Sequence, residues 1–182
     1  MIMDRGVSFP QDRLRSTVPV VMATGPRQIP DQAEFMLEYL SSYEDRAGPP
    51  DAGKMLYNSP DAVLNYTSSG VDEATTFRLH SKGDDSFVLE YVSAYEDRVP
   101  GNEGNFVYNQ EGGNFQWSSV ADEATVFKAV GDQNDFALEI LASYQDRAGE
   151  PRTGMVVYNA DGGNLNYSSV PEEATRFKVT QL

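Results

Sequence analysis

The stretch FMLEYLSSYEDRAG, residues 35–48, occurs three times in this chain with small changes. The second copy is FVLEYVSAYEDRVP at 87–100, and the third is FALEILASYQDRAG at 136–149. Each copy is followed by a closing motif, Glu-Ala-Thr-x-Phe, whose alanines are Ala74, Ala124 and Ala174, 50 residues apart. Self-similarity at a fixed period of this length indicates a fold built from three copies of one supersecondary unit.

Each repeat shows the alternation of apolar and polar residues that is typical of half-buried strands. In the first repeat we predict strands at Met55–Asn58, Val63–Ser68 and Thr76–His80. A short turn separates the first two of these strands. In the second and third repeats the corresponding turn carries paired glycines, at 112–113 and 162–163. Glycine adopts the positive φ that tight hairpin turns require, so these segments are expected to form hairpins.

The opening stretch of each repeat fits two structures. In the third copy Phe136, Leu138 and Ile140 alternate as in a strand, but Asp135 and Gly149 would also cap a helix. A short polar turn joins each copy to the next, which favours a hairpin and therefore the strand. The predicted fold class is all-β, with four strands in each repeat and twelve in total. The alternative is α+β, with the opening stretch of each repeat helical.

The repeats span residues 35–86, 87–135 and 136–182, and together they form one predicted domain at 35–182. Residues 1–34 contain no copy of the motif, carry equal numbers of acidic and basic residues, and include four prolines. Proline is excluded from helix interiors and central strands. We therefore predict that residues 1–34 form an extended N-terminal arm that acts as an interaction element.

With these motifs the chain resembles the β-trefoil superfamily, in which three four-stranded repeats form a six-stranded barrel capped by three hairpins. The resemblance covers residues 35–182 and is closest to lectin-like, arabinofuranose-binding modules. The motifs that carry it are GNFVY at 104–108 and EATVF at 123–127. This chain departs from those modules in two ways: one residue separates Thr from Phe in the closing motif, and the histidine that is usual in their sugar pocket is missing. The Gln-x-Trp motif of ricin-type trefoils is also absent.

Several polar residues recur in all three repeats and are candidate ligand-binding residues. A sugar site could use the Asp-Arg pairs for hydroxyl groups and the tyrosine ring for stacking, whereas a structural role would tie loops and neighbouring repeats together. This set is Tyr43, Asp45, Arg46, Tyr95, Asp97, Arg98, Tyr144, Asp146 and Arg147. The resemblance implies that a sugar pocket would also use polar groups at Asn58, Asn109, Asn159, Glu73, Glu123 and Glu173. The alternative is that the asparagines form turns and the glutamates are surface charges.

Other recurrent residues are expected to be structural. Charged residues on neighbouring strands should pair across the sheet: Glu38, Glu90 and Glu139 with Arg78, Lys128 and Lys178. The recurrent aromatic residues should fill the core: Phe35, Phe77, Phe87, Phe127, Phe136 and Phe177, with Tyr57, Tyr108 and Tyr158.

The composition excludes several functions. The chain has 182 residues, with 28 acidic and 14 basic residues, a net charge of −14 and no cysteine. Such a charge argues against sequence-independent binding to nucleic acid or to anionic membranes. The absence of cysteine excludes disulfides, thiolate metal sites and a cysteine nucleophile. No apolar run reaches about 18 residues, and no secretory signal is evident, so we expect no membrane insertion and a cytoplasmic or particle-associated protein.

The sequence offers little for catalysis. His80 is the only histidine, and none of the common hydrolase or nucleotide-binding motifs is present. We therefore predict a non-catalytic protein with no metal site and no cofactor. The resemblance to sugar-binding trefoils implies a lectin-like module, and the threefold repeat would give it up to three weak glycan sites. The alternative is a structural or assembly protein, such as a virion component, whose arm docks on neighbouring subunits of a homo-oligomer. A third is a protease inhibitor whose loops bind a protein partner.

Overall fold

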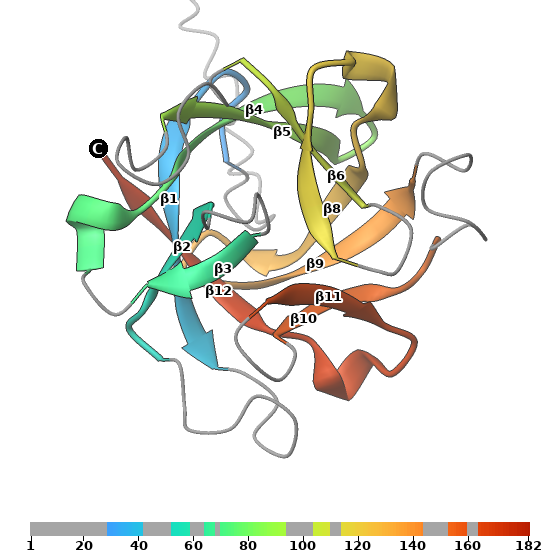
Figure 1. Cartoon of the computed structure of the whole chain (residues 1–182). Coiled ribbons are helices and arrows are strands. Elements are labelled where there is room, and N and C mark those ends of the chain that lie inside the picture. The colour runs from blue at the N-terminus through green and yellow to red at the C-terminus, as the bar shows by residue number, and fades with distance from the viewer. Residues whose placement is uncertain are drawn as a thin grey trace, which may run out of the picture.

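The structure is a computed structural model, and it describes residues 29–41, 52–58, 64–67, 70–93, 104–109, 114–143, 153–159 and 164–182. These residues form twelve strands and three short 3-10 helices, and none of them lies in an α-helix (Figure 1). The predicted all-β class is therefore confirmed. The helical alternative for the opening stretches is wrong, because all three are strands.

The first repeat contains β1 (Glu34–Ser41), β2 (Met55–Asn58), β3 (Leu64–Thr67), the 3-10 helix η1 (Gly70–Glu73) and β4 (Thr76–Gly83). The second contains β5 (Ser86–Ser93), β6 (Phe106–Asn109), β7 (Phe115–Ser118), η2 (Ala121–Glu123) and β8 (Val126–Asp132). The third contains β9 (Asp135–Ala142), β10 (Val156–Asn159), β11 (Leu165–Ser168), η3 (Pro171–Glu173) and β12 (Arg176–Gln181).

Six of the strands close into an antiparallel barrel. Their pairings run in the order β1–β4–β5–β8–β9–β12, and β12 pairs with β1 to complete the ring. The other six form the hairpins β2–β3, β6–β7 and β10–β11, attached to β1, β5 and β9 respectively. Figure 1 shows the three units arranged around a central axis. Closure leaves the barrel strands no free outer edge along most of their length.

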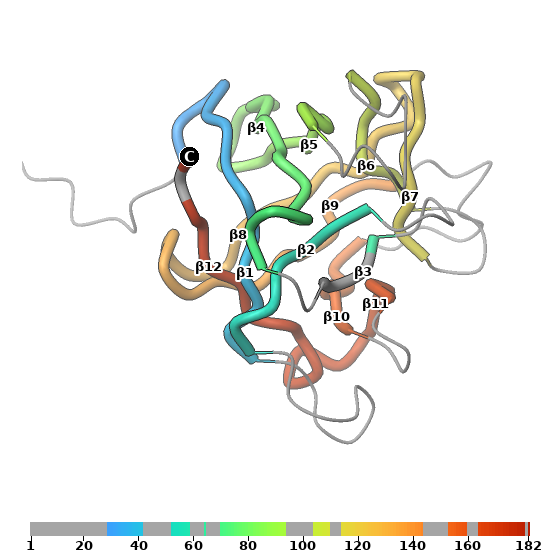
Figure 2. The backbone as a smooth tube through the Cα atoms, turned by 60° about the vertical axis from the view of Figure 1, so that its left-hand side comes forward, coloured from blue at the N-terminus to red at the C-terminus, as the bar shows by residue number. Residues whose placement is uncertain are grey.

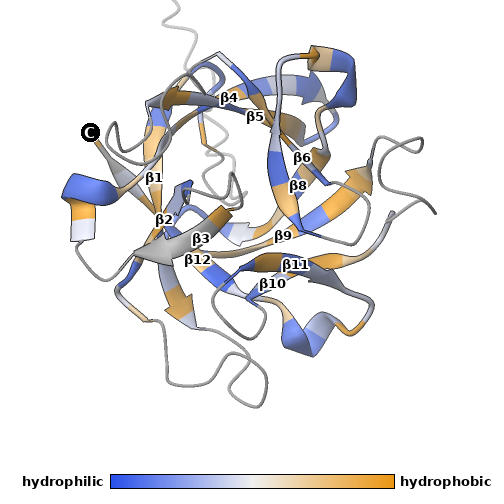
Figure 3. Cartoon of the chain, viewed as in Figure 1, coloured by the Kyte–Doolittle hydropathy of each residue, from blue (hydrophilic) through white to orange (hydrophobic). Residues whose placement is uncertain are grey.

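The repeated phenylalanines form the barrel core in threefold-equivalent pairs. Phe35 lies opposite Phe77, Phe87 opposite Phe127, and Phe136 opposite Phe177. All six are between 0% and 6% exposed, as predicted. The alternation along the barrel strands is visible in Figure 3, where hydrophobic and hydrophilic residues follow one another. Burial of these rings supplies much of the hydrophobic stabilisation of the fold.

The tyrosines of the second strand depart from the prediction. Tyr57 and Tyr158 are only half-buried, and Tyr108 alone of the three is buried. The side chains that reach the core cluster are those one position earlier, Leu56, Val107 and Val157. Successive side chains of a strand point to opposite faces, so a strand that presents the aliphatic residue to the core turns its tyrosine the other way.

Charged pairs stabilise the outer face of the barrel as predicted. Lys178 contacts Glu38 at 2.8 Å, and Arg78 donates a hydrogen bond to Glu90 at 3.2 Å. Lys128 and Glu139 occupy the equivalent opposed positions in the second and third repeats.

The domain begins before the predicted boundary. Gln32 and Ala33 exchange backbone hydrogen bonds with Leu79 of β4, at 2.8 and 3.2 Å, and Ile29 packs against the core. The start of the described chain lies beside the C-terminus at one end of the barrel (Figure 2), where β1 pairs with β12. Residues 29–34 therefore belong to the domain. The remainder of the predicted arm, residues 1–28, lies outside the described residues.

Candidate functional site

The repeated asparagines at the end of the second strand lie inside the molecule. Asn58, Asn109 and Asn159 are each fully buried. The backbone N–H of each donates to the hydroxyl of the threonine in the closing motif, at 2.7 or 2.8 Å. These threonines, Thr75, Thr125 and Thr175, are also fully buried. The structure favours a structural role for the asparagines, and a ligand-binding role stays a prediction that their burial does not support.

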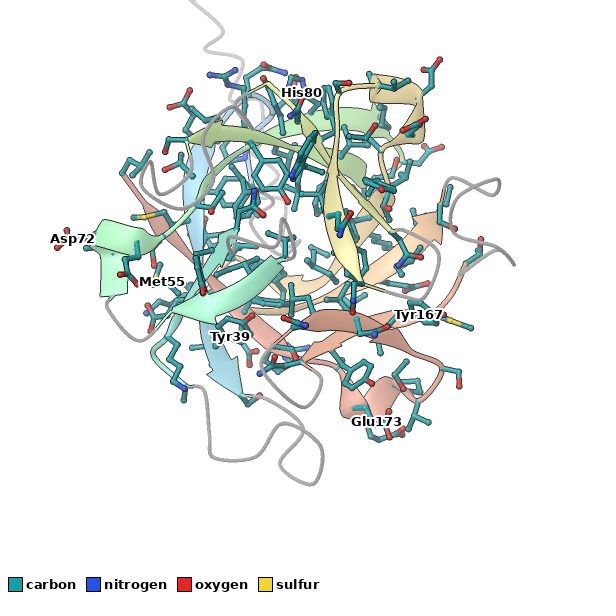
Figure 4. All side chains as sticks on the ribbon, in the orientation of Figure 1. Tyr39, Met55, Asp72, His80, Tyr167 and Glu173 are labelled. Atoms are coloured by element: carbon teal, nitrogen blue, oxygen red, sulfur yellow. The ribbon has the colours of Figure 1, made fainter. Side chains whose placement is uncertain are left out.

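The repeated glutamates before Ala-Thr are buried as well, with 9%, 6% and 6% exposure for Glu73, Glu123 and Glu173. In the second repeat the Ser118 hydroxyl donates to the Glu123 carboxylate and accepts the backbone N–H of Val120 at 3.1 Å. The third repeat has the same arrangement. These contacts fold the 3-10 turn over the end of the preceding strand. Figure 4 shows Asp72, by contrast, projecting outward from η1.

The Tyr, Asp and Arg candidates of the opening stretches lie in three loops outside the described residues: Tyr43, Asp45, Arg46, Tyr95, Asp97, Arg98, Tyr144, Asp146 and Arg147. The bases of these loops are described and are alike. The backbone N–H of Gly53, Gly104 and Gly154 donates to the carbonyl of Tyr39, Tyr91 and Ile140 respectively, at 2.7 or 2.8 Å. Each glycine has φ near +80°, a conformation that favours glycine. The three loops therefore start and end at equivalent, hydrogen-bonded positions on the barrel.

A cleft of about 640 Å³ opens at the end of the barrel where the described chain begins. We call it the barrel-mouth cleft. Its apolar lining comes from Ile29, Pro30, Leu79, Phe87, Ala129, Val130 and Phe136. Its charged lining is Asp31, Asp85, Asp132, Glu139 and Lys128. This volume lies within the range of sites that bind small ligands, and the carboxylates outnumber the single ammonium group.

Residues 29–34 are held at this mouth by side chains as well as by the backbone. Asp31 accepts the backbone N–H of Ser81 at 2.8 Å, and this hydrogen bond lowers the pKa of the Asp31 carboxyl below its ordinary value. Glu34 forms an ion pair with Arg78, and the hydrogen bond between them raises the pKa of the Arg78 guanidinium. The entry of the chain into β1 is thus fixed to β4 at several points.

His80 belongs to the same network on the barrel wall. Its Nε2 lies 2.5 Å from a Glu90 carboxylate oxygen, and its Nδ1 lies 3.1 Å from the Gln32 side chain. Its ring also contacts Phe106 at a centroid distance of 5.6 Å. A nucleophile–base arrangement would require a hydroxyl in reach of one ring nitrogen, whereas both nitrogens face a carboxylate and an amide.

Among the described residues no group of three or more metal-ligating side chains is found, and no helix there is long and apolar enough to cross a membrane. No protein-family model matches the chain, and no curated protein matches it. Among solved structures, it is similar to the crystal structure of a designed 3-fold symmetric protein, ThreeFoil. The TM-score is 0.50 and the sequence identity 18%, over 82% of this chain and 99% of that one.

The fold is a β-trefoil. A likeness at this identity shows the fold alone, so the function of this trefoil has to be argued from its own residues. Sequence reasoning missed the barrel-mouth cleft because its walls come from different repeats. A signal was present in the two turns between repeats, at 83–86 and 132–135, which concentrate acidic residues.

Proposed function

We propose that this trefoil is a non-catalytic, lectin-like module that binds a glycan through three equivalent loops. The observation that carries the proposal is the threefold geometry of the loop bases at Gly53, Gly104 and Gly154. Each base supports a loop with the same Tyr-x-Asp-Arg sequence. A carboxylate and a guanidinium can hydrogen-bond neighbouring sugar hydroxyls, and a tyrosine ring can stack on the apolar face of the sugar.

Threefold presentation also fits a multivalent binder. Three sites on one rigid body gain avidity for a repeating ligand, because the second and third contacts form at a high effective concentration. A catalytic site has no comparable use for three copies. The lone histidine, His80, is engaged by Glu90 and Gln32 on the barrel wall, which supports the non-catalytic part of the proposal.

The test is glycan-array binding by the full chain and by alanine variants of the loop arginines. Arg46→Ala, Arg98→Ala and Arg147→Ala should each weaken binding to a multivalent glycan surface, and the triple variant should lose it. Lys82→Ala removes an exposed cation outside the loops and serves as the matched control. Binding by the triple variant at the wild-type level, or no glycan binding by the wild type, would contradict the proposal.

A second candidate, assembly through the N-terminal arm, is favoured by the anchoring of residues 29–34. Because Gln32 and Ala33 are bonded to β4, the point at which residues 1–28 join the domain is fixed at the barrel mouth. An arm that starts at a fixed point can dock on a neighbouring subunit in a reproducible geometry. Sedimentation velocity of the full chain and of a chain lacking residues 1–28 tests it: an assembly protein self-associates only when the arm is present.

A further inference from the structure

One of the three charged pairs on the barrel wall differs from the other two. In the pairs that contain Arg78 and Lys178, the charged atoms are 3.2 and 2.8 Å apart. Lys128 and Glu139 occupy the equivalent opposed positions on β8 and β9, but among the described residues no ion pair or hydrogen bond engages either side chain. Both residues are half-buried, and both line the barrel-mouth cleft, which the members of the other two pairs do not.

The sequence beside Lys128 removes a second acidic partner. In the first repeat, Glu34 on β1 lies opposite Arg78 on β4 and forms an ion pair with it. In the second repeat the same position on β5 is Ser86, opposite Lys128 on β8. Ser86 also lines the cleft, and its hydroxyl donates to the carbonyl of Gly83 at 2.5 Å. The cleft therefore contains a lysine ammonium that forms no ion pair with the described residues.

The rest of the cleft lining is acidic or apolar. Besides Glu139 it has three aspartates, two of which accept backbone N–H groups at 2.8 Å. Its apolar lining includes the core residues Phe87 and Phe136 and the exposed side chain of Val130. A purely anionic ligand would be repelled by four carboxylates, and a purely cationic one would leave the lysine unpaired. A ligand that carries both charges and an apolar group matches the whole lining.

We propose that the barrel-mouth cleft binds a small zwitterion with an apolar side chain, an α-amino acid of the size of phenylalanine. Its carboxylate pairs with the Lys128 ammonium, its ammonium group pairs with the Glu139 carboxylate, and its side chain lies against the apolar lining. The two charged groups of an α-amino acid are attached to the same carbon, so the ligand links two side chains that do not contact each other. This site is separate from the loops and does not depend on glycan binding by them.

Three related small molecules separate the charges that the site requires. In an NMR titration of the full chain, L-phenylalanine should shift the amide signals of Ala129 and Val130 and leave those of Ala121–Glu123 unchanged. Phenethylamine lacks the carboxylate and 3-phenylpropanoate lacks the ammonium group, so each should bind at least about tenfold more weakly. The absence of shifts at Ala129 and Val130 with phenylalanine, or equal binding by either analogue, would overturn the proposal.

Variants of the unjoined pair assign the two charges to their partners. Lys128→Gln and Glu139→Gln should each weaken phenylalanine binding about tenfold. Lys178→Gln makes the same change in a joined pair outside the cleft and should bind phenylalanine as the wild type does. Lys128→Gln should bind phenethylamine no more weakly than the wild type, because that ligand has no carboxylate. Unchanged phenylalanine binding by Lys128→Gln, or an equal loss in Lys178→Gln, would contradict the site.

Discussion

The threonine of each closing motif shows how one buried hydroxyl can explain a repeated residue. Thr125 is fully buried, its hydroxyl accepts the Asn109 N–H at 2.7 Å, and its own N–H donates to Val107 at 3.0 Å. The motif therefore attaches the end of each hairpin strand to the return segment of the barrel. Retention of threonine in all three repeats follows from this bond.

Thr125→Val keeps the shape of the side chain but removes the acceptor of the Asn109 N–H. A buried donor without a partner costs about 1–3 kcal/mol, so the free energy of unfolding should fall by that amount. Thr125→Ser keeps the hydroxyl and should lose less, through one missing methyl group. Urea denaturation of both variants measures the difference, and a Val variant as stable as the Ser variant would contradict the role of the bond.

The turn between β8 and β9 has no room for a side chain at Gly131. The corresponding turn between β4 and β5 has room for one at Gly83. Gly131 has φ of +131°, and a Cβ built there would lie 2.2 Å from the Asp135 carbonyl oxygen. Gly83 also has positive φ, at +88°, but a Cβ there would meet nothing within 4 Å. Arg176 holds the β8–β9 turn through bonds to Asp135 and to the carbonyl of Val130.

Gly131→Ala should therefore be much more harmful than Gly83→Ala. Backbone strain alone costs about 1–3 kcal/mol at either site, and the clash with Asp135 adds to it only at Gly131. Thermal unfolding followed by circular dichroism compares the two variants. Equal losses would mean that the backbone at Gly131 moves without cost and that the close approach has no structural importance.

The segment that enters β1 should respond to acid through Asp31. The Ser81 N–H lowers the pKa of Asp31 below its ordinary value of 3.8, so folding favours the ionised form. The stabilising contribution is present above the ordinary value and is lost as the pH falls through the lowered one. The Ser81 amide signal should shift in that acidic range in the wild type. Asp31→Ala should abolish the transition, and a transition that persists in this variant would assign it to another group.

Across the whole molecule, the structured domain starts at the barrel mouth and not at the first repeat motif. Ile29 contacts the core, and the bonds of Gln32 and Ala33 cover the edge of β4 at Leu79. The domain therefore uses a few residues of the chain before β1 where the other repeats use a preceding turn. The excess of acidic residues lies in this domain, because residues 29–182 have a net charge of −16.

Two truncations distinguish the segment from the domain. A chain lacking residues 1–28 should remain folded, with the circular dichroism of an all-β protein. A chain lacking residues 1–33 also loses two backbone hydrogen bonds to Leu79 and should be less stable by about 2 kcal/mol, at about 1 kcal/mol for each bond. Equal stability of the two truncated chains would show that residues 29–33 add nothing to the domain.

Much of this architecture was determined by the sequence, because the repeat period and the local alternation are properties of neighbouring residues. They predicted the twelve strands, the phenylalanine core and the opposed pairs such as Glu38 with Lys178. Alternation distinguishes two faces of a strand but does not say which face is inside. Packing of the β2–β3 hairpin against the core buries Leu56 and Asn58 and leaves Tyr57 half-buried.

Only the tertiary structure could reveal the barrel-mouth cleft and the start of the domain at Ile29. Both depend on contacts between distant parts of the chain: residues 29–33 reach β4, and the cleft joins β4, β5, β8 and β9. A sequence repeat describes what the three units share, so it predicts a symmetric barrel. The cleft lies where the units differ, because Ile29, Pro30 and Asp31 of the chain before β1 form part of its wall.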